Sequence, residues 1–120
     1  MKRTYGDVTA TPLSPAVGIG NFLFISGQVP TDTQGLVPDG IVAQTRLVLG
    51  KIDRLLKDAG FTRADVVKTT VFLKETGDFP SMNGVYRDFF GQDFPARSTV
   101  RAELMIDARV EIDAIAMKAA

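Results

Sequence analysis

Two predicted strands of this chain carry apolar side chains on both of their faces. Residues 66–73 form the strongest strand pattern, rich in β-branched side chains, and residues 21–26 form a second, aromatic one flanked by glycines. The apolar side chains on their alternating faces are Val71, Phe72 and Leu73 in the first segment and Phe22, Leu23, Phe24 and Ile25 in the second. A sheet built from such strands needs an apolar cover on each side.

A long amphipathic helix is predicted between these strands. Asp39 is the expected N-cap, the helix runs to about Ala59, and Gly60 is expected to end it. Gly50 inside the helix costs about 1 kcal/mol relative to alanine, which indicates a close contact between helix and sheet. The apolar positions that follow the helical period are Ile41, Val42, Val48, Leu49, Ile52, Leu55, Leu56 and Ala59.

A second helix is predicted after residue 73, with Asp78 as its cap and Gly91 at its end. Its expected buried side consists of Phe79, Met82, Val85, Tyr86, Phe89 and Phe90. Two more strands follow, near residues 98–104 and 109–117. The order strand, helix, strand, helix, strand, strand predicts a two-layer α/β sandwich with both helices on one face of a mixed sheet. The other apolar face is then expected to meet another subunit.

Composition excludes several classes of protein. The 120 residues fit one domain, residues 1–120, and 14 basic and 14 acidic residues give no net charge to attract nucleic acid or an anionic membrane. No apolar run approaches the roughly 20 residues of a membrane span, and the N-terminal segment does not resemble a signal peptide, so the cytoplasm is the expected location. The absence of histidine and cysteine excludes serine–histidine triads and the usual zinc sites. Gly18-Ile19-Gly20-Asn21 is too short for a dinucleotide fingerprint and is predicted to be a turn.

Arg97 is the first candidate functional residue. It follows Pro95 at the start of a predicted strand, where its guanidinium offers a planar set of donors for a carboxylate or phosphate. The alternative is an ordinary surface arginine that opens a strand. Glu111 lies on the polar face of the last strand. If a tight hairpin joins the last two strands, Glu111 lies about 15 Å from Arg97 along the sheet, so a shared site arises more naturally between neighbouring subunits. Alternatively, Glu111 forms a surface pair with Arg101 or Arg109.

Five motifs stand out along the chain. They are Ile25-Ser26-Gly27-Gln28-Val29-Pro30, residues 66–73, Met82-Asn83-Gly84-Val85-Tyr86, Phe94-Pro95-Ala96-Arg97-Ser98 and residues 110–116. Together they resemble the Rid/YjgF family of enamine/imine deaminases, once described as translation-inhibiting endoribonucleases, and they cover nearly the whole chain in the family's order and spacing. The resemblance implies a chorismate-mutase-like α+β fold, assembled as a homotrimer with a central barrel of sheets and with active sites between subunits.

The resemblance also assigns roles to particular residues. Arg97 matches the arginine that binds the substrate carboxylate, and Glu111 matches the acid that positions the attacking water. Ser26 and Gly27 match positions that line the pocket, and Asn83 matches a polar residue beside it. The implied substrate is a 2-imino or 2-enamino acid, which is already electrophilic and needs positioning and modest acid–base help. The resemblance implies no metal and no organic cofactor.

Two positions depart from the family pattern. Leu13 stands where the family often has a tyrosine, and Thr99 stands where it has a cysteine beside the substrate. These departures leave open a binding or chaperone-like protein without efficient turnover, and a deaminase specialised for aminoacrylate-like or aminomuconate-like substrates. Asn83 can also be a solvent-facing or subunit-contact residue, and Ser26 can simply satisfy a strand end. Neutral charge and the lack of histidine argue against a ribonuclease.

Overall fold

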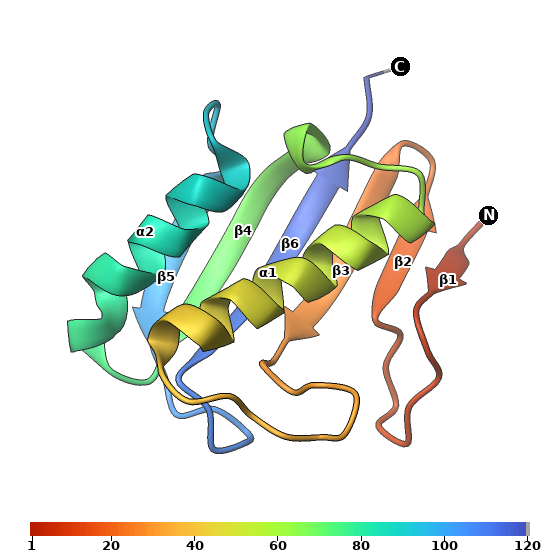
Figure 1. The fold of residues 1–120 in the computed structure, drawn as a ribbon. Coiled ribbons are helices and arrows are strands. Elements are labelled where there is room, and N and C mark those ends of the chain that lie inside the picture. The colour runs from red at the N-terminus through yellow and green to blue at the C-terminus, as the bar shows by residue number, and fades with distance from the viewer. Residues whose placement is uncertain (120) are drawn as a thin grey trace.

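The computed structural model of the protein describes residues 1–119, in which two helices cover one face of a six-stranded sheet (Figure 1). Across the sheet the strands follow the order β1-β2-β3-β6-β4-β5. The α+β fold with two helices on one face of a mixed sheet is therefore confirmed. The elements are β1 (Arg3–Tyr5), β2 (Ala16–Ile19), β3 (Phe22–Gln28), α1 (Ile41–Asp58), β4 (Val66–Leu73), α2 (Phe79–Phe90), β5 (Ala96–Arg101) and β6 (Val110–Met117), with short 3₁₀ turns at Arg63–Asp65 and Thr76–Asp78.

The predicted hairpin between the last two strands is wrong. β5 pairs only with β4, in parallel, whereas β6 lies between β3 and β4 and is antiparallel to both. The physical reason is the crossover through α2, which places β5 parallel to β4 on its outer side. The chain must then pass the end of β4 before it returns, and residues 102–109 make that passage. They are tied to β4 by backbone hydrogen bonds from Ala102 N to Leu73 O and from Lys74 N to Arg109 O.

The N-terminal part of the sheet holds two strands that the sequence patterns did not reveal. β1 and β2 are short and extend the sheet beyond β3. Gly18 and Ile19 belong to β2, so only Gly20 and Asn21 form the predicted turn, which joins β2 and β3. Gly20 has φ +56°, a left-handed backbone that such a tight turn requires.

The core lies between the helices and the sheet. β4 and β6 each turn every second side chain toward the helices, and α1 supplies an apolar stripe to meet them. The members with less than 2% exposure include Leu23, Val48, Leu49, Ile52, Leu56, Val71, Met82, Val110 and Ile112. Burial of this surface contributes roughly 25 cal/mol per Å² and provides the main stabilisation of the layer contact.

The predicted helix ends are partly right. Gly40, with φ 87°, is the N-cap of α1 instead of Asp39, because a backbone that glycine adopts most easily turns the chain into the helix there. Gly60, with φ +81°, follows the last residues of α1 as predicted. Asp78 and Gly91 are the caps of α2, but Asp78 makes no capping hydrogen bond and instead pairs with Arg109, 3.0 Å away.

Two expectations about helix faces are wrong. Gly50 is exposed, and a Cβ added there would meet nothing within 4 Å, so it marks no close contact with the sheet. Phe79, expected on the buried side of α2, is 42% exposed.

The face of the sheet that lacks helices is rich in apolar side chains. Phe22 and Phe24 stack with ring centroids 5.9 Å apart. Apolar side chains on this open face include Phe22, Phe24, Phe72, Val100, Ile115 and Met117. Within the described residues, neither helix is long and apolar enough to cross a membrane.

Candidate active site

Arg97 lies on the edge strand β5 and points toward α2. It is level with Thr69 of β4, whose side chain is buried beneath the helices. The guanidinium carbon of Arg97 is 4.8 Å from the ring centroid of Tyr86 and 5.6 Å from that of Phe79. Two aromatic rings of α2 therefore hold the guanidinium by cation–π contact.

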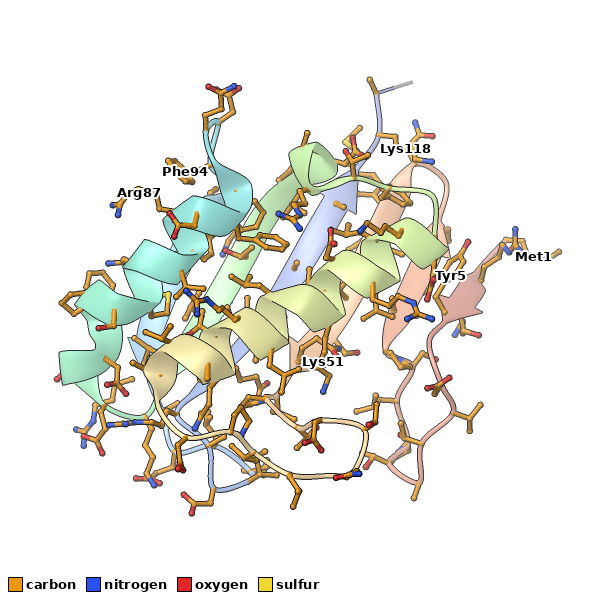
Figure 2. The ribbon with its side chains drawn as sticks, in the orientation of Figure 1. Met1, Tyr5, Lys51, Arg87, Phe94 and Lys118 are labelled. Atoms are coloured by element: carbon orange, nitrogen blue, oxygen red, sulfur yellow. The ribbon has the colours of Figure 1, made fainter. Side chains whose placement is uncertain are left out.

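A hollow of about 270 Å³ opens beside this guanidinium. Arg87 and Phe94, which contribute to it, lie at the same end of α2 (Figure 2). No acidic side chain lines the hollow, so an anionic ligand meets only cationic, amide and apolar groups. The lining residues are Asn83, Tyr86, Arg87, Phe94, Pro95 and Arg97.

Two further candidate residues, Asn83 of α2 and Thr99 of β5, come from the same two elements as Tyr86 and Arg97. Asn83 lines the hollow, and its Oδ1 atom is buried and accepts no hydrogen bond from the described residues. Thr99 is two residues beyond Arg97 on the same face of β5 and lines a second hollow, of about 310 Å³, with Phe79. Asn83, Arg97 and Thr99 are called the arginine half-site below.

Ser26, Gly27 and Glu111 form a second cluster, called the glutamate half-site. The pairing of β3 with β6 shifts between Ile25 and Gln28, so Ser26 and Gly27 form a bulge in the strand. The Ser26 hydroxyl donates to the carbonyl of Ser14, 2.7 Å away. The Glu111 carboxyl lies directly over Gly27, where an added Cβ would be only 2.9 Å from Glu111 Cδ. The missing side chain at Gly27 therefore makes room for the carboxyl group.

The surroundings of Glu111 change its acidity. Partial burial raises the pKa of the Glu111 carboxyl, and the nearby negative charge of Asp113 raises it further. Asp113 itself accepts a hydrogen bond from the backbone N–H of Thr70, 3.1 Å away, which holds it on the same strand face. Glu111 thus keeps its proton to a higher pH than an exposed glutamate, which suits a group that exchanges protons with a substrate.

The two half-sites do not meet within one chain. Arg97 is level with Thr69 and faces the helices, whereas Glu111 is level with Phe72 and lies on the open face. Two strand spacings across the sheet and three residues along it separate their Cα atoms by about 14 Å, with β4 between them. The expectation that Arg97 and Glu111 of one chain stay apart is therefore confirmed, although the reason is the order of strands and not a hairpin.

The sequence model of a protein family described as Endoribonuclease L-PSP matches residues 7–118. The structure of a protein from Yersinia pestis, described as a member of the conserved Rid protein family, matches with a TM-score of 0.93 at 36% identity, over 98% of this chain and 100% of that one. This chain belongs to the Rid/YjgF family.

Curated relatives of this Rid/YjgF chain carry two kinds of name. A RutC family protein from Pyrococcus horikoshii is 47% identical over 110 residues, which are 89% of this chain and 87% of the relative. A 2-iminobutanoate/2-iminopropanoate deaminase from Escherichia coli is 40% identical over 112 residues, 89% of this chain and 88% of the relative. The resemblance inferred from the five motifs is therefore confirmed at the level of the family.

The two departures from the Rid/YjgF pattern lie in different places. Leu13 is 49% exposed in the segment between β1 and β2, next to Ser14, whose carbonyl holds the Ser26 hydroxyl. Thr99 belongs to the arginine half-site.

The contact of Tyr86 with Arg97 was not among the sequence predictions. Tyr86 was expected on the buried side of its helix, and it is 4% exposed, but the Arg97 guanidinium also packs on its ring. An aromatic residue on the buried side of a helix gives no sequence signal of such a contact.

Among residues 1–119, no three Asp or Glu side chains gather where a metal ion could bind.

Proposed function

We propose that this protein hydrolyses reactive 2-imino acids and their 2-enamino tautomers to 2-oxo acids and ammonia, at sites formed between copies of the chain. The observation that carries the proposal is the Arg97 guanidinium, which lies on aromatic rings beside a hollow with no acidic lining. Such a group binds a carboxylate through two parallel N–H donors. The deaminase name of the Escherichia coli relative supports the reaction class.

Glu111 supplies the proton transfers of the proposed reaction. The protonated carboxyl donates to the imine nitrogen while the oxygen of water bonds to the imine carbon, and the carboxylate then accepts a proton from that water. The protonated Glu111 carboxyl then donates a proton to the amine nitrogen, and the carboxylate accepts the proton of the new hydroxyl group. The carbon–nitrogen bond breaks, ammonia leaves and the carbonyl of the 2-oxo acid forms. The sum is one imine and one water converted to one ketone and one ammonia. The reaction neither oxidises nor reduces its substrate, and no step calls for a cofactor.

The separation of the half-sites favours an assembly of copies. Glu111 of one copy and Arg97 of the next must approach the same substrate, and the apolar open face gives a second copy a surface on which to pack. We propose the trimer of the family, with three sheets facing a central barrel. In this arrangement Ser26 and Gly27 line one wall of each site, and Asn83 and Thr99 line the other.

The first test follows imine hydrolysis in a coupled assay. An amino-acid oxidase generates 2-imino acids in the presence of semicarbazide, and active protein suppresses semicarbazone formation. We expect Arg97→Ala to abolish the suppression, Glu111→Gln to lower turnover more than substrate binding, and Arg54→Ala, an exposed helix arginine, to change nothing. An assembled wild-type protein with no effect on several imino acids would favour a binding protein or a more specialised substrate.

A second test asks whether each site combines two copies. Arg97→Ala and Glu111→Gln are each expected to be inactive alone. The two variants are then dissociated, mixed in equal amounts and reassembled. In a random assembly, the copy that supplies Glu111 to a site has it intact in one half of cases, and so does the copy that supplies Arg97, so about a quarter of the sites are intact. Recovery of about a quarter of the activity supports the shared site, and no recovery refutes it.

A further inference from the structure

The Arg97 guanidinium is held in place by uncharged groups. Within residues 1–119 it forms no ion pair, and its described contacts are the rings of Tyr86 and Phe79. Arginine has a long, flexible side chain, and an unpaired guanidinium at a strand edge would sample many orientations in the absence of a ligand. The aromatic contacts are what restrict it.

Tyr86 is itself fixed at two points. Its hydroxyl shares a hydrogen bond of 2.7 Å with the hydroxyl of Thr69, which is 1% exposed in β4. Its ring also packs against Phe90, with centroids 4.7 Å apart. Burial raises the pKa of the Tyr86 phenol, so the hydroxyl stays protonated at neutral pH and keeps its hydrogen bond.

These contacts form a closed circuit of three residues. Thr69 and Arg97 are side-by-side partners in the parallel pair β4 and β5. The side chain of Thr69 reaches Tyr86, and the ring of Tyr86 returns to the guanidinium of Arg97. The contacts run from β4 to α2 and back to β5, so they fix the position of the guanidinium relative to its own strand.

We infer that Tyr86 is a positioning residue for carboxylate binding, anchored by Thr69, and that it sets the Arg97 guanidinium in its binding orientation before a ligand arrives. A preordered guanidinium loses less conformational freedom on binding, so its affinity for a carboxylate is higher. This inference rests on the carboxylate-binding role proposed for Arg97. It adds that the role depends on a neighbouring uncharged side chain.

The test measures binding of 2-oxobutanoate, a stable 2-oxo acid, and of its uncharged methyl ester, by NMR titration of the assembled protein. Loss of the ring in Tyr86→Leu is expected to raise the dissociation constant for the acid about tenfold. Tyr86→Phe keeps the ring and is expected to stay within about threefold of wild type. Neither change is expected to alter binding of the ester, which does not need the guanidinium charge.

Two further variants guard against misfolding. Thr69→Val removes the anchor hydroxyl without touching the ring, and it is expected to weaken acid binding by a few fold even if Tyr86→Leu fails to fold. Phe89→Leu is the matched control, because Phe89 lies on the same helix and contacts Phe90 and Arg63. It is expected to leave both dissociation constants unchanged.

The outcomes separate the inference from the proposed function. If Arg97→Ala abolishes acid binding while Tyr86→Leu and Thr69→Val bind like wild type, the positioning role is refuted and the carboxylate role stands. Equal weakening of acid and ester binding in Tyr86→Leu would mean a purely structural role and would also refute it. If Arg97→Ala binds the acid like wild type, the proposed carboxylate role itself fails.

Discussion

Gly27→Ala is the substitution that most directly tests the placement of Glu111. An alanine Cβ at this position would collide with Glu111 Oε2 and would lie 2.9 Å from Glu111 Cδ, whereas non-bonded heavy atoms in contact are about 3.5 to 4.0 Å apart. The carboxyl group must therefore move by about 1 Å or more. Since a misplacement of about 1 Å can cost about 10²-fold in rate, we expect kcat for imine hydrolysis to fall by up to about 100-fold. KM is expected to change little, because the proposed carboxylate ligand is Arg97, which the substitution does not touch.

The semicarbazide assay measures the Gly27→Ala rate, and circular dichroism with urea unfolding measures the fold. Gly27 is exposed and its φ is not positive, so alanine fits the backbone, and we expect stability to change by no more than about 0.5 kcal/mol. Gly50→Ala is the matched control, since an added Cβ there meets nothing. A folded Gly27→Ala protein with wild-type kcat would show that Glu111, where it lies, takes no part in the reaction.

Three further predictions concern stability. Gly50→Ala should raise the free energy of unfolding by about 1 kcal/mol, because Gly50 is an exposed position inside α1, and thermal unfolding should show a Tm higher by about 3 to 5 °C. Lys51→Met should lower the free energy of unfolding by about 2 kcal/mol, since it removes charge-assisted hydrogen bonds to the carbonyls of Val29, 2.8 Å away, and Thr31, 3.2 Å away. Urea unfolding measures this change, and an unchanged midpoint would contradict it. The raised pKa of Glu111 means that the folded state binds the carboxyl proton more tightly than the unfolded chain does. The contribution of this group to the free energy of unfolding is therefore fully present below about pH 4.3, the pKa in the unfolded chain, and is lost as pH rises through the raised pKa of the folded state. The stability of Glu111→Gln relative to wild type should therefore increase between about pH 4 and pH 8, and a flat difference would contradict the shift.

The loop after β3, next to the glutamate half-site, is hydrogen-bonded to α1. Figure 2 shows Lys51 extending from α1 toward the segment that follows β3. Its ammonium group bonds to the carbonyls of Val29 and Thr31 and to the Thr31 hydroxyl, and burial lowers its pKa. This segment begins two residues after Gly27. The Lys51→Met protein therefore offers a way to loosen the glutamate half-site without changing any of its members.

The fold was predictable where the hydrophobic pattern was long. The 18-residue helix α1 and the eight-residue strand β4 contain enough periodic apolar positions for the sequence to predict each element and its type. β1 has only three residues and β2 contains a glycine, so neither gives a pattern that differs from a loop. The order of strands was not predictable from alternation, because alternation fixes which face a side chain occupies and not which strand lies beside it.

The candidate site was predictable through its motifs and not through its geometry. Arg97 and Glu111 are named by short segments that resemble a family, and the structure places them in two separate clusters. The contact of Tyr86 with Arg97 could not be predicted, because the buried ring of Tyr86 fits the pattern of a core residue equally well. The bulge at Ser26 and Gly27 depends on how β3 pairs with β6, which is a long-range property that no local pattern contains.

The central position of β6 has a consequence for synthesis of the chain. β6 follows every other element in sequence, yet it lies between β3 and β4, so these two strands have no contact through the sheet until β6 leaves the ribosome. Until then a nascent chain exposes two open strand edges with apolar side chains, which is the form of a chain most prone to aggregate. The growing polypeptide therefore cannot complete its sheet segment by segment, and shielding by a ribosome-associated chaperone would be most useful in the interval before residues 110–117 emerge.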